Sequence, residues 1–197
     1  YHSEMLDGKA SEIRINPIYD KTNMVYSLFC AEGDFDDEAI VSYGDIVYSK
    51  SILNKVINSK SDIAVAIDKD WESYWRARND NPLNDAETLK LTSDNRITEI
   101  GQKPNSIDEV EGQYMGLMKF SKKGFNILRK IFYDFKKIGN INGKSFDKAY
   151  MTDLFQAMIK LDIRIDAVPI SGNWIEIDTV DDLNSEITKD RLRNITQ

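Results

Sequence analysis

Short apolar runs alternate along the chain with stretches in which apolar residues recur every three or four positions. The runs rich in Ile, Val and Tyr predict strands, and the periodic stretches predict amphipathic helices. Strands are expected over 13–15, 39–43, 62–68, 89–91, 97–100, 114–120, 165–170 and 174–177. Helices are expected to begin near Thr22 or Asn23, at Ser49 and at Ser121, and to cover 146–161 and 181–192.

The run 62–68 is almost unbroken in its apolar character, which is typical of a strand covered by helices on both faces. Residues 69–83 follow it as a polar region, expected to be largely a loop. Residues 93–95 join two short strands as a hairpin turn. We find no internal repeat and no linker, so the alternation predicts a single three-layer α/β domain over 1–197. Its sheet is expected to be mixed and mainly parallel.

Composition narrows the possible chemistry. The chain has 41% hydrophobic and 30% charged residues, which fits a soluble globular protein, and no apolar stretch approaches the ~20 residues of a membrane span. The formal charge of −7 argues against nucleic-acid binding but not against a small anionic ligand with a metal. His2 is the only histidine, which excludes histidine triads and histidine zinc sites. Cys30 is the only cysteine, which excludes an internal disulfide and fits a cytoplasmic protein.

Two carboxylates follow predicted strands that lie far apart in the sequence. Asp45 comes directly after Gly44 at the end of one strand, and Asp178 closes the strand over 174–177, on the same face as Glu176. Ligands of open α/β sheets bind at the carboxyl ends of strands. Two such carboxylates can hold Mg²⁺ against nucleotide phosphates. The alternatives are that Asp45 caps the next helix and that Asp178 belongs to the acidic start of the last helix.

An aromatic cluster follows the buried strand. Trp71, Tyr74 and Trp75, with Arg78 nearby, could form a ligand wall that attracts a cationic amine. They could equally form a hydrophobic cluster under a loop, and the sequence leaves both interpretations open. The helix start at 23–27 is open in the same way, because its free amides could face a nucleotide or simply be capped.

The segments 16–28, 43–45 and 174–179 occur in the order and spacing of a known family. Together they resemble the nucleotidyltransferases related to phosphocholine cytidylyltransferase. Trp71, Trp75, Arg78 and the segments 82–87 and 112–117 are more similar still to the phosphonate cytidylyltransferases. The resemblance implies a Rossmann-like, GT-A-like fold shared with sugar-1-phosphate nucleotidyltransferases. It also implies Mg²⁺-dependent transfer of a nucleoside monophosphate to a phosphate or phosphonate, with release of pyrophosphate.

The resemblance also implies roles for individual residues. Asp45 and Asp178 would be the catalytic residues and the ligands of Mg²⁺. The residues expected near the nucleotide are Asn23, Met24, Ser27, Tyr43 and Gly44. The residues expected near the acceptor are Trp71, Tyr74, Trp75, Arg78, Gln113, Tyr114 and Glu176.

One feature of the family is not found in this sequence. Members open with a strand and a Gly-rich basic loop that grips the triphosphate, so the chain is expected to be a fragment that lacks this portion and turns over little by itself. The predicted reaction is transfer of CMP from CTP to a phosphocholine-like or aminoalkylphosphonate-like acceptor. A homo-oligomer or a fusion to another catalytic domain is compatible with this prediction. The alternatives are a sugar-1-phosphate nucleotidyltransferase, a non-catalytic nucleotide-binding domain and a glycosyltransferase of similar fold.

Overall fold

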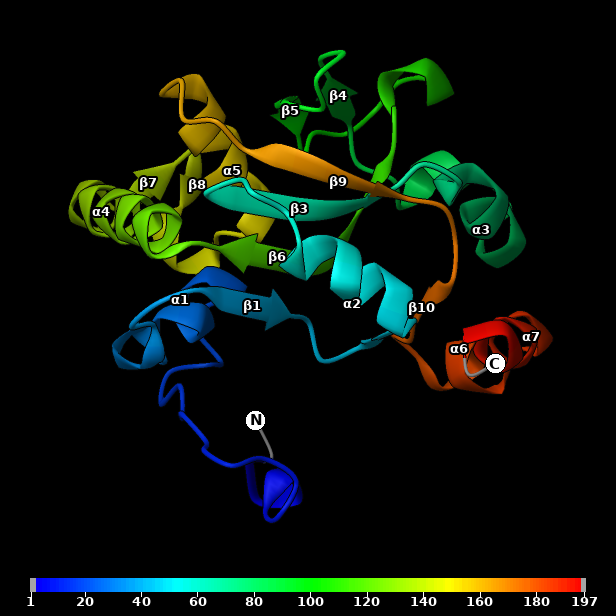
Figure 1. Ribbon diagram of the computed structural model, residues 1–197, viewed down its shortest axis with the longest axis horizontal. Coiled ribbons are helices and arrows are strands. Elements are labelled where there is room, and N and C mark those ends of the chain that lie inside the picture. The colour runs from blue at the N-terminus through cyan, green and yellow to red at the C-terminus, as the bar shows by residue number, and fades with distance from the viewer. Residues whose placement is uncertain (1–2, 196–197) are drawn as a thin grey trace.

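A four-stranded mixed sheet forms the centre of the computed structural model, which describes residues 3–195 (Figure 1). The strand order is β1 (Ala39–Ser42), β6 (Gln113–Phe120), β3 (Ile63–Asp68) and β9 (Asp166–Ile170). The prediction of a mixed sheet is confirmed, but β6 runs antiparallel to both β1 and β3, and only β9 is parallel to β3. The described sheet is therefore not mainly parallel. Strand β6 begins at the carboxyl end of β3, so Asp68 lies opposite Gln113.

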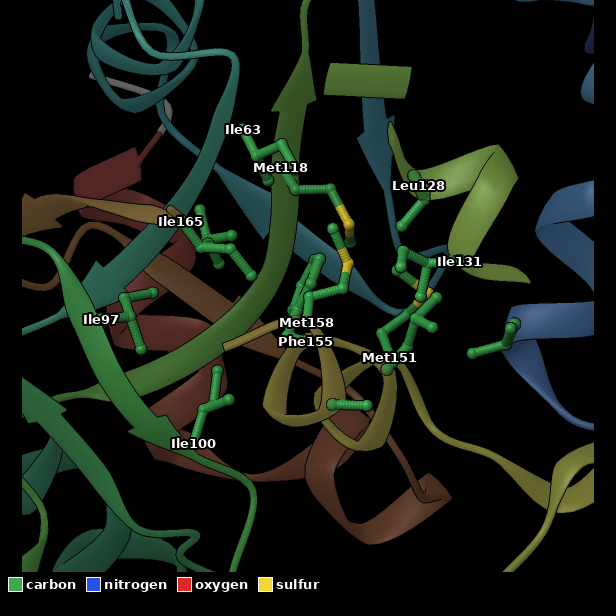
Figure 2. Close-up of a cluster of buried hydrophobic side chains, with 14 of the residues drawn as sticks. Ile63, Ile97, Ile100, Met118, Leu128, Ile131, Met151, Phe155, Met158 and Ile165 are labelled. Carbon is green, nitrogen blue, oxygen red and sulfur yellow. The ribbon is translucent and has the colours of Figure 1, made fainter. Parts of the chain in front are cut away.

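Strand β3 is buried on both faces, as its apolar run predicts. Val65 belongs to a large hydrophobic cluster shared with helices α1 (Met24–Phe29), α4 (Lys122–Ile138) and α5 (Met151–Lys160), which Figure 2 shows. Its neighbour Ala66 belongs to the cluster on the other face, formed with α2 (Lys50–Ile57) and α3 (Trp71–Arg78). Successive side chains of a strand point to opposite faces, so one apolar run supplies both cores.

Smaller elements surround this sheet. Strand β2 (Ile46–Tyr48) pairs with β10 (Trp174–Glu176), β4 (Leu89–Leu91) pairs with β5 (Ile97–Ile100), and β7 (Asn140–Ile141) pairs with β8 (Lys144–Ser145). The helices α6 (Val180–Asn184) and α7 (Glu186–Ile195) follow β10. Short 3-10 helices cover Ser3–Leu6, Glu32–Asp34, Pro82–Asn84, Ile107–Glu109 and Phe146–Lys148. Within residues 3–195, no helix is both long and apolar enough to span a membrane.

Two sequence-based expectations for the secondary structure are wrong. Residues 13–15 form no strand, because they have no pairing partner among the described strands. The region 69–83 is not largely a loop, because it contains α3. Trp71, Tyr74 and Trp75 have the i, i+3, i+4 spacing that places them on one buried face of that helix. The polar residues between them occupy its other face and hide the pattern.

Candidate active site

The pairing of β2 with β10 brings together the two strand-end carboxylates. In this antiparallel register Glu176 lies opposite Ile46, and the backbone N–H of Ile177 donates to the carbonyl of Asp45 at 2.9 Å. Asp45 therefore lies immediately before one strand of the pair, and Asp178 lies just after the other. Both side chains are exposed. Two carboxylates that are 133 residues apart in sequence thus share one edge of the molecule.

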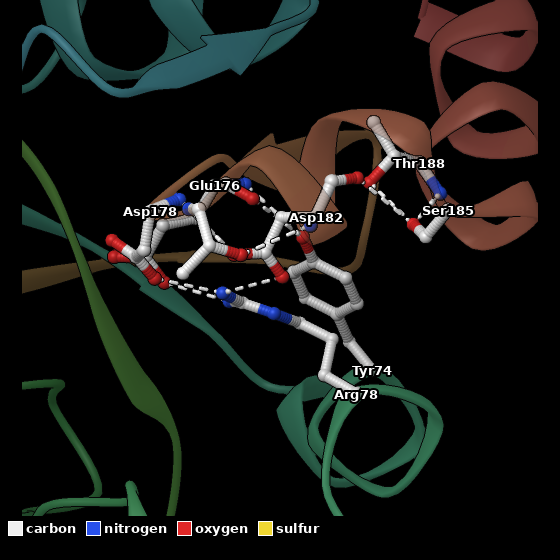
Figure 3. Close-up of polar contacts among 8 residues, drawn as sticks. Tyr74, Arg78, Glu176, Asp178, Asp182, Ser185 and Thr188 are labelled. Carbon is white, nitrogen blue, oxygen red and sulfur yellow. Dashed lines mark hydrogen bonds and ion pairs between the residues drawn. The ribbon is translucent and has the colours of Figure 1, made fainter.

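The nearly buried guanidinium of Arg78 pairs with carboxylates at the end of β10 and just after it (Figure 3). Arg78 of α3 is 3.0 Å from Glu176, 2.7 Å from Asp178 and 3.3 Å from Asp182. Its side chain is only 11% exposed, so water screens these contacts less than those of a surface pair. The hydroxyl of Tyr74 also accepts a hydrogen bond from the backbone N–H of Glu176 at 3.1 Å. Helix α3 therefore fixes the position of β10 and of its carboxylates.

The acidity of Glu176 reflects this environment. Burial and the neighbouring Asp178 raise its pKa to about 7, although the Arg78 guanidinium acts in the opposite direction. The side chain therefore stands between its neutral and ionised forms at physiological pH. A further cation at this edge would favour the ionised form.

A cavity of about 260 Å³ opens beside these carboxylates. Its lining residues come from α1, α3, β6, β10, the start of α5 and the loops that follow β1 and precede β4: Met24, Tyr43, Trp75, Asp85, Glu87, Gln113, Tyr114, Tyr150, Thr152 and Glu176. Tyr43 and Tyr114 meet edge to face, with ring centroids 5.7 Å apart. Gly116 has a φ of +79°, and a Cβ at that position would lie 2.6 Å from the Tyr43 ring. The glycine therefore allows Tyr43 to take its place in the cavity wall.

The cavity is acidic as well as aromatic. Asp85, Glu87 and Glu176 contribute carboxylates, and its lining residues within the described chain include no lysine or arginine. Glu87 accepts a hydrogen bond from the hydroxyl of Thr152 at 3.4 Å, while its own backbone N–H donates to Gln113. Burial, with a contribution from the charge of Asp153, raises the pKa of the Glu87 carboxyl. Such a cavity favours a ligand whose inserted end is cationic.

The predicted site residues separate into three groups. Those that line the cavity are Met24, Tyr43, Trp75, Gln113, Tyr114 and Glu176. Trp71 and Tyr74 lie in the core, and the indole N–H of Trp71 donates to the carbonyl of Val110. Arg78 lies between the carboxylates rather than in the cavity wall. For these three residues, direct contact with a substrate stays a prediction.

Three residues predicted near the nucleotide do not line the cavity. Asn23 caps α1, its side chain accepting from the N–H of Met24 at 2.8 Å. Ser27 is exposed and accepts a hydrogen bond from Asn16 at 2.9 Å. Gly44 is exposed between Tyr43 and Asp45. Their contacts with a nucleotide also stay predictions.

Four residues that line the cavity have no role predicted from the sequence. Asp85 and Glu87 could have been found from the sequence, because they belong to the segment 82–87 that takes part in the family resemblance. Tyr150 and Thr152 could not have been found in this way, because polar residues at the start of a helix are typical of caps. They reach the cavity through the packing of α5 against β5 and the contact of Thr152 with Glu87.

Asp45 and Asp178, at the edge where β2 and β10 meet, are of a kind that can bind Mg²⁺. This ion takes oxygen ligands, keeps several waters and is often held by one or two carboxylates together with substrate phosphates. Asp45 and Asp178 offer two carboxylates at one edge, while no group of three or more His, Cys, Asp or Glu in the described part of the chain forms a metal-binding cluster. The arrangement suits a metal that arrives with a nucleotide.

Comparison with solved structures defines the class of fold. The structure matches the inositol-1-phosphate CTP transferase of T. maritima with a TM-score of 0.63 and 20% identity, over 90% of this chain and 64% of that one. It matches a Bacillus anthracis protein assigned as a glucose-1-phosphate thymidylyltransferase with a TM-score of 0.65 and 15% identity, over 97% and 72%. The chain thus spans less than two thirds of the first of these proteins. The fold is that of the nucleotidyltransferases.

Sequence comparison defines the family within that class. The chain is 42% identical over 185 residues to the CTP:phosphoglutamine cytidylyltransferase of Campylobacter jejuni, covering 89% of this chain and 71% of that protein. It therefore belongs to the cytidylyltransferase family of nucleotidyltransferases, which confirms the resemblance found in its motifs. No family model matches the sequence.

A test of the cavity follows from the raised pKa of Glu87. Below the ordinary glutamate pKa of 4.5, the carboxyl is protonated in the folded and the unfolded chain alike. As the pH rises through 4.5 and then through the native pKa, the unfolded chain releases the proton first, so the free energy of unfolding decreases. Glu87→Gln removes this dependence. We expect the stability of the variant relative to the wild type to increase between pH 4 and pH 8 in urea denaturation. A stability difference between variant and wild type that is constant with pH would contradict the raised pKa of Glu87.

Proposed function

We propose that the protein transfers a cytidylyl group from CTP to a small phosphorylated acceptor that carries a cationic amino group, with release of pyrophosphate. The observation that carries the proposal is the acidic, aromatic cavity that opens at Glu176, beside the edge that holds Asp45 and Asp178. Membership of the cytidylyltransferase family supports CTP as the donor. The Campylobacter jejuni relative is by name a phosphoglutamine cytidylyltransferase, which supports a small phosphorylated acceptor.

In the proposed reaction, an acceptor phosphate or phosphonate oxygen attacks the α-phosphorus of CTP. The bond from the α-phosphorus to its bridging oxygen breaks, and pyrophosphate leaves with that oxygen. The protein contributes positioning and charge stabilisation rather than covalent chemistry. Mg²⁺, held by Asp45 and Asp178, would supply positive charge to the phosphates when it is bound. The carboxylates and rings of the cavity would hold the amino end of the acceptor so that its phosphate lies at the same edge.

The acceptor is tested by pyrophosphate release with CTP and parallel substrates. We expect phosphocholine or 2-aminoethylphosphonate to give a kcat/KM at least about tenfold above that of glucose-1-phosphate, because a buried carboxylate discriminates strongly between a cation and a neutral group. A higher kcat/KM for glucose-1-phosphate would contradict the amine and favour a sugar-nucleotide enzyme. Binding of CTP without turnover of any acceptor would favour a non-catalytic nucleotide-binding domain.

Tyr150→Ala gives a matched test of the aromatic wall. Tyr150 lines the cavity but is 47% exposed, so its truncation leaves the core intact. A cation over an aromatic ring is stabilised by about 0.5–2 kcal/mol, so kcat/KM for the amine acceptor should fall about 2- to 30-fold while CTP affinity stays unchanged. Tyr133→Ala is the control, because Tyr133 is 42% exposed on α4 and does not line the cavity.

A further inference from the structure

Arg191 joins helix α7 to the start of β10, which lies beside it (Figure 1). The Nε–H of Arg191 donates to the backbone carbonyl of Trp174 at 3.2 Å. Its guanidinium carbon also lies over the Tyr74 ring, 3.9 Å from the ring centroid. The hydroxyl of Tyr74 in turn bonds the backbone of Glu176. Arg191 thus connects the last helix to the segment that leads into the candidate active site.

The charge of Arg191 is not compensated by a carboxylate. It is the one arginine of residues 3–195 that forms no ion pair, although the chain has 33 acidic residues against 26 lysines and arginines. Its terminal nitrogen Nη2 is buried and has no hydrogen-bond acceptor in the described part of the chain. A shielded N–H without an acceptor is costly, and an uncompensated charge adds to that cost. Such a group indicates a ligand or ion that accepts from it.

A cavity of about 90 Å³ lies at this guanidinium, and its lining residues are Gly172, Asn173, Arg191 and Asn194. A Cβ at Gly172 would lie 3.7 Å from Nη2 of Arg191, so Nη2 lies on the side of the cavity where Gly172 has no side chain. The two asparagines bring amide groups that can donate hydrogen bonds, and no carboxylate lines the cavity. A single water needs roughly 10–15 Å³ of such a cavity. The cavity therefore has room for a larger group.

We propose that this cavity binds a small oxyanion of the size of phosphate or sulfate. Arg191 supplies the positive charge and a free N–H, and the amides of Asn173 and Asn194 can each donate a further hydrogen bond. Water would accept from Nη2 but leave the charge uncompensated, and a cation would be repelled. The bound anion would fasten α7 to the turn before β10. The inference is independent of the proposed function, because none of these residues lines the cavity at Glu176.

Calorimetric titration of the protein with sodium phosphate and with sodium sulfate tests the site. Ionic strength is held constant with sodium chloride, so that general effects of salt cancel. EDTA removes divalent metal, so that phosphate does not bind at the Asp45 and Asp178 edge through a metal ion. We expect saturable binding of at least one of the two oxyanions. The absence of saturable binding of both would overturn the inference.

Arg191→Met then locates the binding. The substitution removes the charge and the free N–H, so the affinity for the bound oxyanion should fall about tenfold or more. Arg193→Met is the matched control, because Arg193 is an exposed arginine of the same helix, is paired with Asp190 and does not line the cavity. It removes the same charge and should leave the affinity within about twofold of the wild type. Affinity that survives in Arg191→Met, or equal losses in the two variants, would overturn the inference.

Two variants of Asn194 keep the inference testable if Arg191→Met does not fold. Asn194 is exposed, so its replacement leaves the core intact. Asn194→Asp places a carboxylate at the cavity wall beside Arg191, so the protein supplies its own anion, and oxyanion affinity should fall about tenfold or more. Asn194→Ala removes one amide without adding charge and should lower it less, about 2- to 10-fold. Unchanged affinity in Asn194→Asp, or a loss no greater than in Asn194→Ala, would overturn the inference.

Discussion

Asp45→Asn and Asp178→Asn should each lower kcat for cytidylyl transfer by about 100- to 10,000-fold while the protein stays folded. Asparagine keeps the shape of the side chain but removes its charge. The reaction concentrates negative charge on the phosphates, and Asp45 and Asp178 lie at the one edge where β2 and β10 meet. Both side chains are exposed, so neither substitution disturbs the core. Steady-state rates at saturating Mg²⁺ and CTP measure the effect.

Asp181→Asn is the matched control for this pair. Asp181 is an exposed acidic residue in the first turn of α6, close to Asp178 in sequence. Its replacement changes the net charge of the protein by the same amount and should leave kcat within about twofold of the wild type. Near wild-type turnover in Asp45→Asn or Asp178→Asn would remove the metal-binding role from that residue. Equal losses in all three variants would point to a general effect of charge.

Local signals account for the parts of the fold that could be predicted. The run of β3, the turn of the β4–β5 hairpin and the cap at Ser121 are each specified by residues close together in sequence. Strand direction is not specified in this way, because it depends on where a distant segment enters the sheet. This is why the sheet was expected to be mainly parallel, whereas β6 runs antiparallel to both of its neighbours. Helix α3 was missed because Trp71, Tyr74 and Trp75 stand among polar residues, which lowers the local hydrophobicity.

In the candidate site, too, some features can be predicted from local sequence and others depend on distant segments. Carboxylates at strand ends have a recognisable position in sequence, which singles out Asp45 and Asp178. The register of β2 and β10 brings them to one edge, and their role as metal ligands stays a prediction. The cavity is assembled from segments that are distant in sequence. Thr152 reaches Glu87 because Gly101 has no side chain where a Cβ would lie 2.6 Å from Thr152. No pattern within one segment records such a contact.

The position of β10 depends on a buried carboxylate at the end of β3. Asp68 is 0% exposed, and it accepts hydrogen bonds from the backbone N–H groups of Asp70 and Gly172, both at 3.0 Å. It also accepts from the indole N–H of Trp174 at 2.7 Å. Trp174 is the first residue of β10, and Glu176 ends the strand just before Asp178. Asp68 therefore acts as a positioning residue that ties the end of β3 to the strand leading into the candidate site.

Asp68→Ala should lower the free energy of unfolding by about 3–5 kcal/mol, because it leaves three donors without an acceptor and opens a small cavity. Urea denaturation measures this loss. Asp70→Ala is the control, since Asp70 is exposed and its side chain makes no capping hydrogen bond to α3, and it should change stability by less than about 0.5 kcal/mol. If the indole of Trp174 positions β10, Asp68→Ala should also lower kcat at temperatures where the variant is still folded. Full kcat in a destabilised variant would show that Arg78 and Tyr74 of α3 are sufficient to hold Glu176 and Asp178 in place.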